Sequence, residues 1–102
     1  MEIIVKWSKS ALADLRNIFN YIRPDSPMQA DRIRSEIFDF TDGFSARPRG
    51  ATIVPELKEE NIRQRLFYGW RIIYMIDDKK NRIIIMAVLH GKREFVQIEE
   101  RF

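Results

Sequence analysis

The chain has no cysteine, and only one of its 102 residues is a histidine. Without thiols it can form no disulfide, iron–sulfur cluster or cysteine zinc site, and thiolate catalysis is excluded. One imidazole without a partner makes a poor metal site, so we expect no metal. The absence of cysteine also fits a reducing compartment, and we expect the protein in the cytoplasm.

Long apolar runs and the short motifs of cofactor enzymes are also missing. No apolar run approaches the ~18 residues that a membrane span needs, and residues 1–6 show neither the basic stretch nor the cleavage site of a signal peptide. Nor does the sequence contain a phosphate-binding glycine loop, a pair of metal-ligating histidines or a nucleophile elbow. We therefore expect no membrane insertion, no export and no cofactor.

Charged, apolar and aromatic residues are plentiful by contrast. The chain is 45% hydrophobic, 32% charged and 12% aromatic, which is enough to bury a core beneath a charged surface. A length of 102 residues fits one domain, so residues 1–102 are predicted to form a single domain. The net charge of +3 allows an acidic partner such as nucleic acid but does not demonstrate one.

The first half of the chain shows the pattern of a short strand followed by two helices. Alternation of apolar residues over 3–7 predicts the strand. Ser8 can cap a first helix, which apolar residues at helical spacing predict over residues 9–22. Ser26 and Pro27 then provide a cap and a first-turn proline for a second helix. We expect the two helices to form a hairpin.

The second half changes to the two-residue period of strands. Strands are predicted over residues 52–54, 62–67, 70–76 and 82–89. The last two are apolar at nearly every position and should form the central hairpin of an antiparallel sheet of about four to five strands, covered at least in part on both faces. The fold class is therefore α+β, with the helical hairpin packed on the sheet. The spacing of Phe95, Ile98 and Phe102 predicts a closing helical turn or two, or a partner-binding face.

Basic side chains concentrate in the second half. Arg63, Arg65 and Arg71 alternate along two neighbouring predicted strands, which predicts a basic surface on one face of the sheet. Guanidinium forks bind phosphate oxygens, so such a surface suits nucleic acid. The candidate residues for binding nucleic acid or another target are Arg63, Arg65, Lys92 and Arg93. The alternative is a solvated sheet face balanced by nearby glutamates.

Two other ionisable side chains each have two interpretations. His90, at the end of the last predicted strand, is either a solvated or core-edge imidazole or a general acid or base, because imidazole titrates near neutral pH. Glu56, which follows Pro55, is either a base within the basic surface or the counter-ion of an arginine. The residues alone leave both choices open.

Short motifs occur in a fixed order along the chain. They are Trp7-Ser8, Asp14-Leu15, Tyr21-Ile22, Ser26-Pro27, Val54-Pro55-Glu56-Leu57, Ile62-Arg63, Arg71-Ile72-Ile73-Tyr74, Val88, His90-Gly91 and Arg93. From the first strand to Arg93, this set resembles the RelE/ParE superfamily of toxins from bacterial type II toxin–antitoxin systems, and its ParE-like members in particular. The resemblance implies an α+β toxin that a cognate antitoxin neutralises.

The resemblance leaves the target open, because members of this superfamily act in two ways. Members similar to YoeB cut mRNA on the ribosome without metal, using a glutamate base, a phosphate-binding arginine, a histidine and a tyrosine. By motif position Glu56, Arg71 and His90 match the first three and are the catalytic candidates of an mRNA interferase, but Gly91 stands where the tyrosine is expected. Members similar to ParE poison DNA gyrase and cut nothing.

The absent tyrosine, the short ending after His90 and the low net charge favour DNA gyrase as the target over the ribosome and its mRNA. Enzymatic activity is expected only with the second target. The resemblance also implies an antitoxin that folds onto the helical hairpin and the sheet edge, with operator DNA contacted only through that antitoxin. A third interpretation is a chain that has lost toxicity and only helps to repress its own operon.

Overall fold

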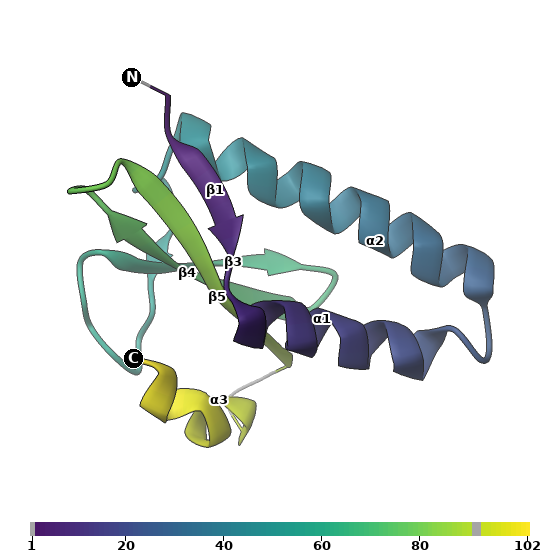
Figure 1. The fold of residues 1–102 in the computed structure, drawn as a ribbon. Coiled ribbons are helices and arrows are strands. Elements are labelled where there is room, and N and C mark those ends of the chain that lie inside the picture. The colour runs from purple at the N-terminus through teal and green to yellow at the C-terminus, as the bar shows by residue number, and fades with distance from the viewer. Residues whose placement is uncertain (1, 91–92) are drawn as a thin grey trace.

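A computed structural model describes residues 2–90 and 93–102. A strand, a helical hairpin and four further strands are followed by a short C-terminal helix (Figure 1). The elements are β1 Ile4–Trp7, α1 Lys9–Ile22, α2 Pro27–Asp42, η1 Gly43–Ala46, β2 Thr52–Ile53, β3 Ile62–Phe67, β4 Trp70–Asp77, β5 Arg82–His90, α3 Arg93–Ile98 and η2 Glu99–Arg101. The predicted helices and strands are all present, and the α+β fold class is confirmed.

The two long helices begin where serine side chains cap them. Ser8 Oγ accepts a hydrogen bond from the Ala11 N–H at 3.0 Å, and Ser26 Oγ accepts one from the Gln29 N–H at 3.2 Å. Pro27 is at the start of α2, where no intrahelical donor is needed. Because these signals are local, the sequence pattern alone located both helices, which lie alongside each other in Figure 1.

The five strands form one sheet in the order β1-β5-β4-β3-β2. β4 is the middle strand and pairs antiparallel with β5, as predicted for the central hairpin. β1 pairs with β5 in parallel, so the sheet is mixed and the purely antiparallel prediction is wrong for this edge. Parallel neighbours need a long crossover connection, and the chain between β1 and β5, with its helical hairpin, supplies one.

Both faces of the sheet are buried, each beneath a different helical element. On one face, α1, α2 and η1 pack against the strands and form a first core. The buried members of the first core are Ala11, Leu15, Phe19, Ile33, Ile37, Phe44, Phe67, Ile72, Tyr74, Ile76, Ile83, Ile85 and Val88. A second core on the other face consists of Val54, Ile62, Ile73, Ala87, Leu89, Phe95 and Ile98. The prediction that both faces of the central hairpin are covered is confirmed.

A bulge interrupts the pairing of β4 with β5. Ile73 pairs with Ala87 whereas Tyr74 pairs with Ile85, so Met86 is an extra residue with no partner in β4. An inserted residue shifts the alternation of side chains by one and bends the strand. The bulge therefore decides to which face of the sheet each side chain after Met86 in β5 points.

Candidate functional site

An ion pair joins the loop after β2 to the middle strand. Arg71, in β4, donates from Nη1 to Glu56 Oε1 at 2.9 Å and from Nη2 to Glu56 Oε2 at 2.7 Å. Nη1 also donates to Oε1 of Gln64, in β3, at 2.9 Å. The Phe95 ring of α3 lies over this guanidinium, with 5.5 Å between Arg71 Cζ and the ring centroid. Residues from separate parts of the chain thus enclose one cation.

Burial explains why Arg71 needs these contacts. The residue is only 8% exposed, and its Nε has no hydrogen-bond partner among the described residues. A buried cation is tolerated only with a compensating anion and hydrogen bonds, and breaking such a pair is costly. Glu56 is the counter-ion of Arg71 in this structure, and both Nη atoms of the guanidinium are engaged.

The basic residues of β3 and β4 lie on opposite faces of the sheet, so the predicted single basic surface is wrong. Arg65 stands opposite Ile72, and Leu66 stands opposite Arg71. Because cross-strand partners share a face, Arg65 faces the first core and Arg71 the second. Arg63, two residues before Arg65, lies on the same face as Arg65.

Arg63 and Arg65 hold the loop before β2 against the sheet. Arg63 Nη1 donates to the Ala51 carbonyl at 2.9 Å, and Arg65 Nη2 donates to the Arg47 carbonyl at 2.8 Å. The Arg65 guanidinium also lies over the Phe44 ring, 4.9 Å from its centroid. Hydrogen bonds to carbonyl oxygens use donors that a phosphate would otherwise take, so the geometry favours a structural role for both side chains.

The other two predicted target-binding residues are described only in part. Lys92 lies outside the described residues, and Arg93 is described only as the first residue of α3, without its side chain. Binding by Arg63, Arg65, Lys92 and Arg93 stays a prediction.

His90 lies on the opposite face from Arg71. It is the last residue of β5, is exposed, and stands opposite Trp70, whereas Arg71 stands opposite Leu89. The His90 and Trp70 rings meet edge to face, with 6.1 Å between their centroids. Trp70 packs against the first core. The structure therefore brings Glu56 and Arg71 together but places the third catalytic candidate, His90, on the other face.

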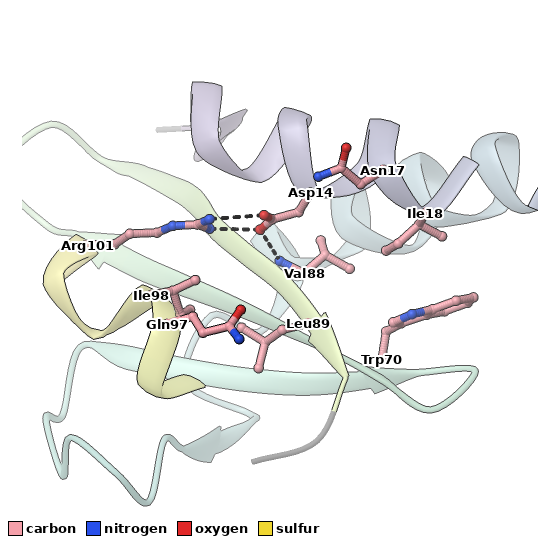
Figure 2. A pocket seen from close by; sticks show the side chains of 9 residues that line it. All are labelled: Asp14, Asn17, Ile18, Trp70, Val88, Leu89, Gln97, Ile98 and Arg101. Carbon is pink, nitrogen blue, oxygen red and sulfur yellow. Dashed lines mark hydrogen bonds and ion pairs between the residues drawn. The ribbon is translucent and has the colours of Figure 1, made fainter. Parts of the chain in front are cut away.

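A group of polar side chains that sequence reasoning missed surrounds a pocket of about 330 Å³ beside α1 and α3 (Figure 2). It is lined by Asp14, Asn17, Ile18, Trp70, Val88, Leu89, Gln97, Ile98 and Arg101. Asp14 falls three residues after Ala11 and four before Ile18, on the inner stripe of α1. An acidic residue within that apolar stripe was the signal that could have identified it.

Asp14 and Arg101 form a bidentate ion pair in this pocket, which we name the clasp. Arg101 Nη1 donates to Asp14 Oδ2 at 2.8 Å, and Nη2 donates to Oδ1 at 3.0 Å. Asp14 Oδ2 also accepts the Val88 N–H at 3.0 Å, and Arg101 Nη1 donates to the Met86 carbonyl at 3.1 Å. The hydrogen bond with Asp14 raises the pKa of Arg101 despite partial desolvation.

The described part of the chain holds neither a membrane span nor a set of metal ligands. None of its helices has both the length and the apolar character required to cross a bilayer. Among residues 2–90 and 93–102, no group of three or more histidine, aspartate and glutamate side chains is arranged to bind a metal ion.

Residues 5–95 match a protein family described as the ParE toxin of type II toxin-antitoxin system, parDE. The match covers most of the chain, so this protein belongs to the ParE toxin family, within the RelE/ParE superfamily, and is a toxin of a type II toxin–antitoxin system. A comparison with curated protein sequences gives no match.

Solved toxin structures share the fold. The chain matches the chromosomal ParDE system from P. aeruginosa with a TM-score of 0.73 and 15% identity, over 89% of this chain and 98% of that one. For a free mutant of the E. coli toxin RelE the TM-score is 0.68 at 15% identity, over 97% of this chain and 94% of that one. For the YoeB dimer from Staphylococcus aureus the TM-score is 0.58 at 14% identity, over 90% of this chain and 100% of that one. At these identities the likeness shows the fold alone.

Proposed function

We propose that this toxin stops growth by binding and poisoning DNA gyrase, without cleaving nucleic acid, and that a cognate antitoxin keeps it inactive in the cytoplasm. The family description supports the ParE-like target, and two further solved relatives are toxin–antitoxin complexes, RelBE2 from Mycobacterium tuberculosis and RelE with a RelB peptide. Operator DNA is reached only through the antitoxin.

The separation of His90 from Glu56 and Arg71 is the observation that carries this proposal. General acid–base cleavage of RNA needs a base and an acid on either side of one phosphate, each within hydrogen-bonding reach. Here Glu56 is bound to Arg71, which lies beneath Phe95, and His90 lies on the other face of the sheet. A toxin that acts by binding gyrase needs no acid and base at one phosphate, so this arrangement supports binding rather than cleavage.

The alternative is a ribosome-dependent mRNA interferase. In that mechanism Glu56 would accept the proton of an RNA 2′-hydroxyl as it attacks the adjacent phosphorus, Arg71 with Arg65 would stabilise the phosphate charge, and His90 would protonate the leaving oxygen. The adjacency of Glu56 and Arg71 favours this candidate. The site would have to open and rearrange before His90 or Arg65, which both lie on the other face of the sheet, could take part.

A brief induction in a bacterial host tests the two targets. Thymidine and methionine incorporation are followed over the first minutes, with and without the antitoxin. We expect DNA synthesis to fall first, antitoxin to restore it, and the variants Glu56→Gln and His90→Ala to arrest growth as the wild type does. Exposed Glu59→Gln serves as the matched control, and circular dichroism checks that each variant folds.

Methionine incorporation that falls first, together with loss of toxicity in His90→Ala, would replace the gyrase proposal with the interferase. If neither incorporation falls when the wild-type chain is induced alone, the chain is not an active toxin in that host, and the regulatory interpretation takes its place.

A further inference from the structure

The second core depends on the last ten residues of the chain. Residues 93–102, here named the C-terminal segment, place Phe95 and Ile98 against the sheet, where both are buried. Phe102 stacks on Phe95 with 5.8 Å between ring centroids and 8° between ring planes. Because Phe95 also lies over the Arg71 guanidinium, this segment covers Arg71, whereas Glu56 is exposed. Wider access to the Arg71 guanidinium therefore requires the segment to move.

The clasp attaches the far end of this segment to the body of the protein. Arg101 belongs to η2, near the end of the chain, and Asp14 belongs to α1. Figure 2 shows the two side chains meeting above β5, with the Val88 N–H completing the set of hydrogen bonds. The clasp thus connects η2 and β5 with α1, which is far from both in sequence.

The clasp also takes the place of a strand on an uncovered stretch of β5. β1 pairs only with residues 82–85, so the part of β5 from Met86 onward extends beyond it. There the Asp14 carboxylate accepts the Val88 N–H, as a carbonyl of a neighbouring strand would, and Arg101 donates to the Met86 carbonyl, as an N–H would. Because the clasp bonds these main-chain groups, it acts as part of the sheet edge. The same groups are then not available to pair with a strand of another chain.

We propose that Asp14 and Arg101 are positioning residues that lock the C-terminal segment over Arg71 and so keep its guanidinium closed to phosphate groups. The clasp holds the far end of the segment through Arg101. Removing either partner leaves a partly buried charge without its counter-ion and frees the far end. The inference rests on the proposed function for its meaning, since a closed Arg71 guanidinium suits a toxin that binds without cleaving.

Purified wild-type protein and three variants test the lock. Asp14→Asn keeps an oxygen that can accept the Val88 N–H but removes the charge, and Arg101→Gln removes the guanidinium fork. The control is Arg82→Gln, because Arg82 pairs with Asp77 at 3.0 Å and their exposures, 27% and 20%, are close to the 22% and 17% of the clasp. Circular dichroism shows that each variant is folded.

Two measurements report the position of the C-terminal segment. Phenylglyoxal, which modifies accessible guanidinium groups, is mapped by mass spectrometry to measure the reactivity of Arg71. Hydrogen exchange measures the protection of α3. We expect both Arg71 modification and α3 exchange to become about tenfold faster in Asp14→Asn and Arg101→Gln, and to stay at the wild-type rate in Arg82→Gln. The double variant should show the same rates of modification and exchange as either single variant, because each substitution removes the same interaction.

Unchanged Arg71 modification in both clasp variants would overturn the inference, as would an equal increase in Arg82→Gln. If Asp14→Asn fails to fold, Arg101→Gln alone decides the test, because it changes no residue of α1 or β5. The variant Arg101→Lys keeps a positive charge and should protect Arg71 and α3 better than Arg101→Gln does. None of these readouts needs growth arrest. If the wild-type chain affects neither gyrase nor growth, the proposed function is wrong, but the result of the Arg71 modification experiment is still valid.

Discussion

At the scale of single residues, the partners that the fold supplies decide what each arginine of the sheet does. Arg71 binds the Glu56 carboxylate, whereas Arg63, on the adjacent strand, binds Glu60 and also donates to carbonyl oxygens of the loop before β2. Neither leaves its guanidinium open for a phosphate in this structure. The residue type suggested nucleic-acid binding, and the partners found in the fold point instead to structural roles.

The Glu56–Arg71 pair gives the first prediction at this scale. Glu56→Ala should lower the free energy of unfolding by about 3 kcal/mol, because the buried Arg71 cation loses its counter-ion. The double variant Glu56→Ala with Arg71→Met should recover part of that loss, since no uncompensated charge remains. Urea unfolding measures both. Glu59→Ala, which changes an exposed residue of the same loop, is the control and should leave the unfolding midpoint almost unchanged; a similar loss there would refute the burial argument.

At the scale of elements, the turn between β3 and β4 is held to α2 by one side chain. Tyr68 and Gly69 both have positive φ, 49° and 88°, as a two-residue hairpin turn requires. Tyrosine rarely adopts this conformation, but the Tyr68 hydroxyl donates to Glu36 Oε2 of α2 at 2.6 Å. The hydrogen bond connects the hairpin to the helix and offsets the backbone strain.

This contact predicts a pH dependence. The hydrogen bond to Glu36, with the charge of that carboxylate, raises the pKa of Tyr68. A raised folded-state pKa contributes stability that is present below the ordinary value of about 10 and is lost as the pH rises through the folded value. NMR of ring-labelled tyrosine should therefore show Tyr68 titrating above the ordinary range, and Glu36→Ala should return its pKa toward it. An unchanged pKa in Glu36→Ala would show that the contact is absent in solution.

At the scale of the whole molecule, the sheet is a middle layer between two cores. The helical hairpin covers one face and the C-terminal segment the other. This arrangement explains why β4 is apolar at consecutive positions, Ile72 and Ile73, whose side chains point in opposite directions. It also makes the C-terminal segment necessary for burial of the second face.

Consecutive truncations in β4 test the two-sided sheet. Ile72 and Ile73 are both 0% exposed, so Ile72→Ala and Ile73→Ala should each cost about 2–5 kcal/mol of unfolding free energy. Leu66→Ala, at a site 67% exposed in β3, should change it by less than about 0.5 kcal/mol. Thermal or urea unfolding measures all three. An Ile73→Ala variant as stable as the wild type would mean that the C-terminal segment does not cover this face in solution.

The register between β3 and β4 is the feature of this hairpin that the sequence analysis did not predict. Alternation along β3 and β4 predicted the strands correctly but put Arg63, Arg65 and Arg71 on one face. The two-residue turn sets Phe67 opposite Trp70, and counting back from it sets Leu66, not Arg65, opposite Arg71. The error was therefore avoidable, because turn length fixes register in a hairpin.

The sequence by itself determined the α+β class, the two capped helices, the central hairpin and the resemblance to a toxin family, because caps, turns and periodicity act over a few residues. Tertiary structure decided the parallel pairing of β1, the bulge at Met86, the burial of Arg71 with Glu56 and the Asp14–Arg101 clasp. Each of these joins residues distant in the chain, and their energies depend on burial and geometry that no local pattern encodes.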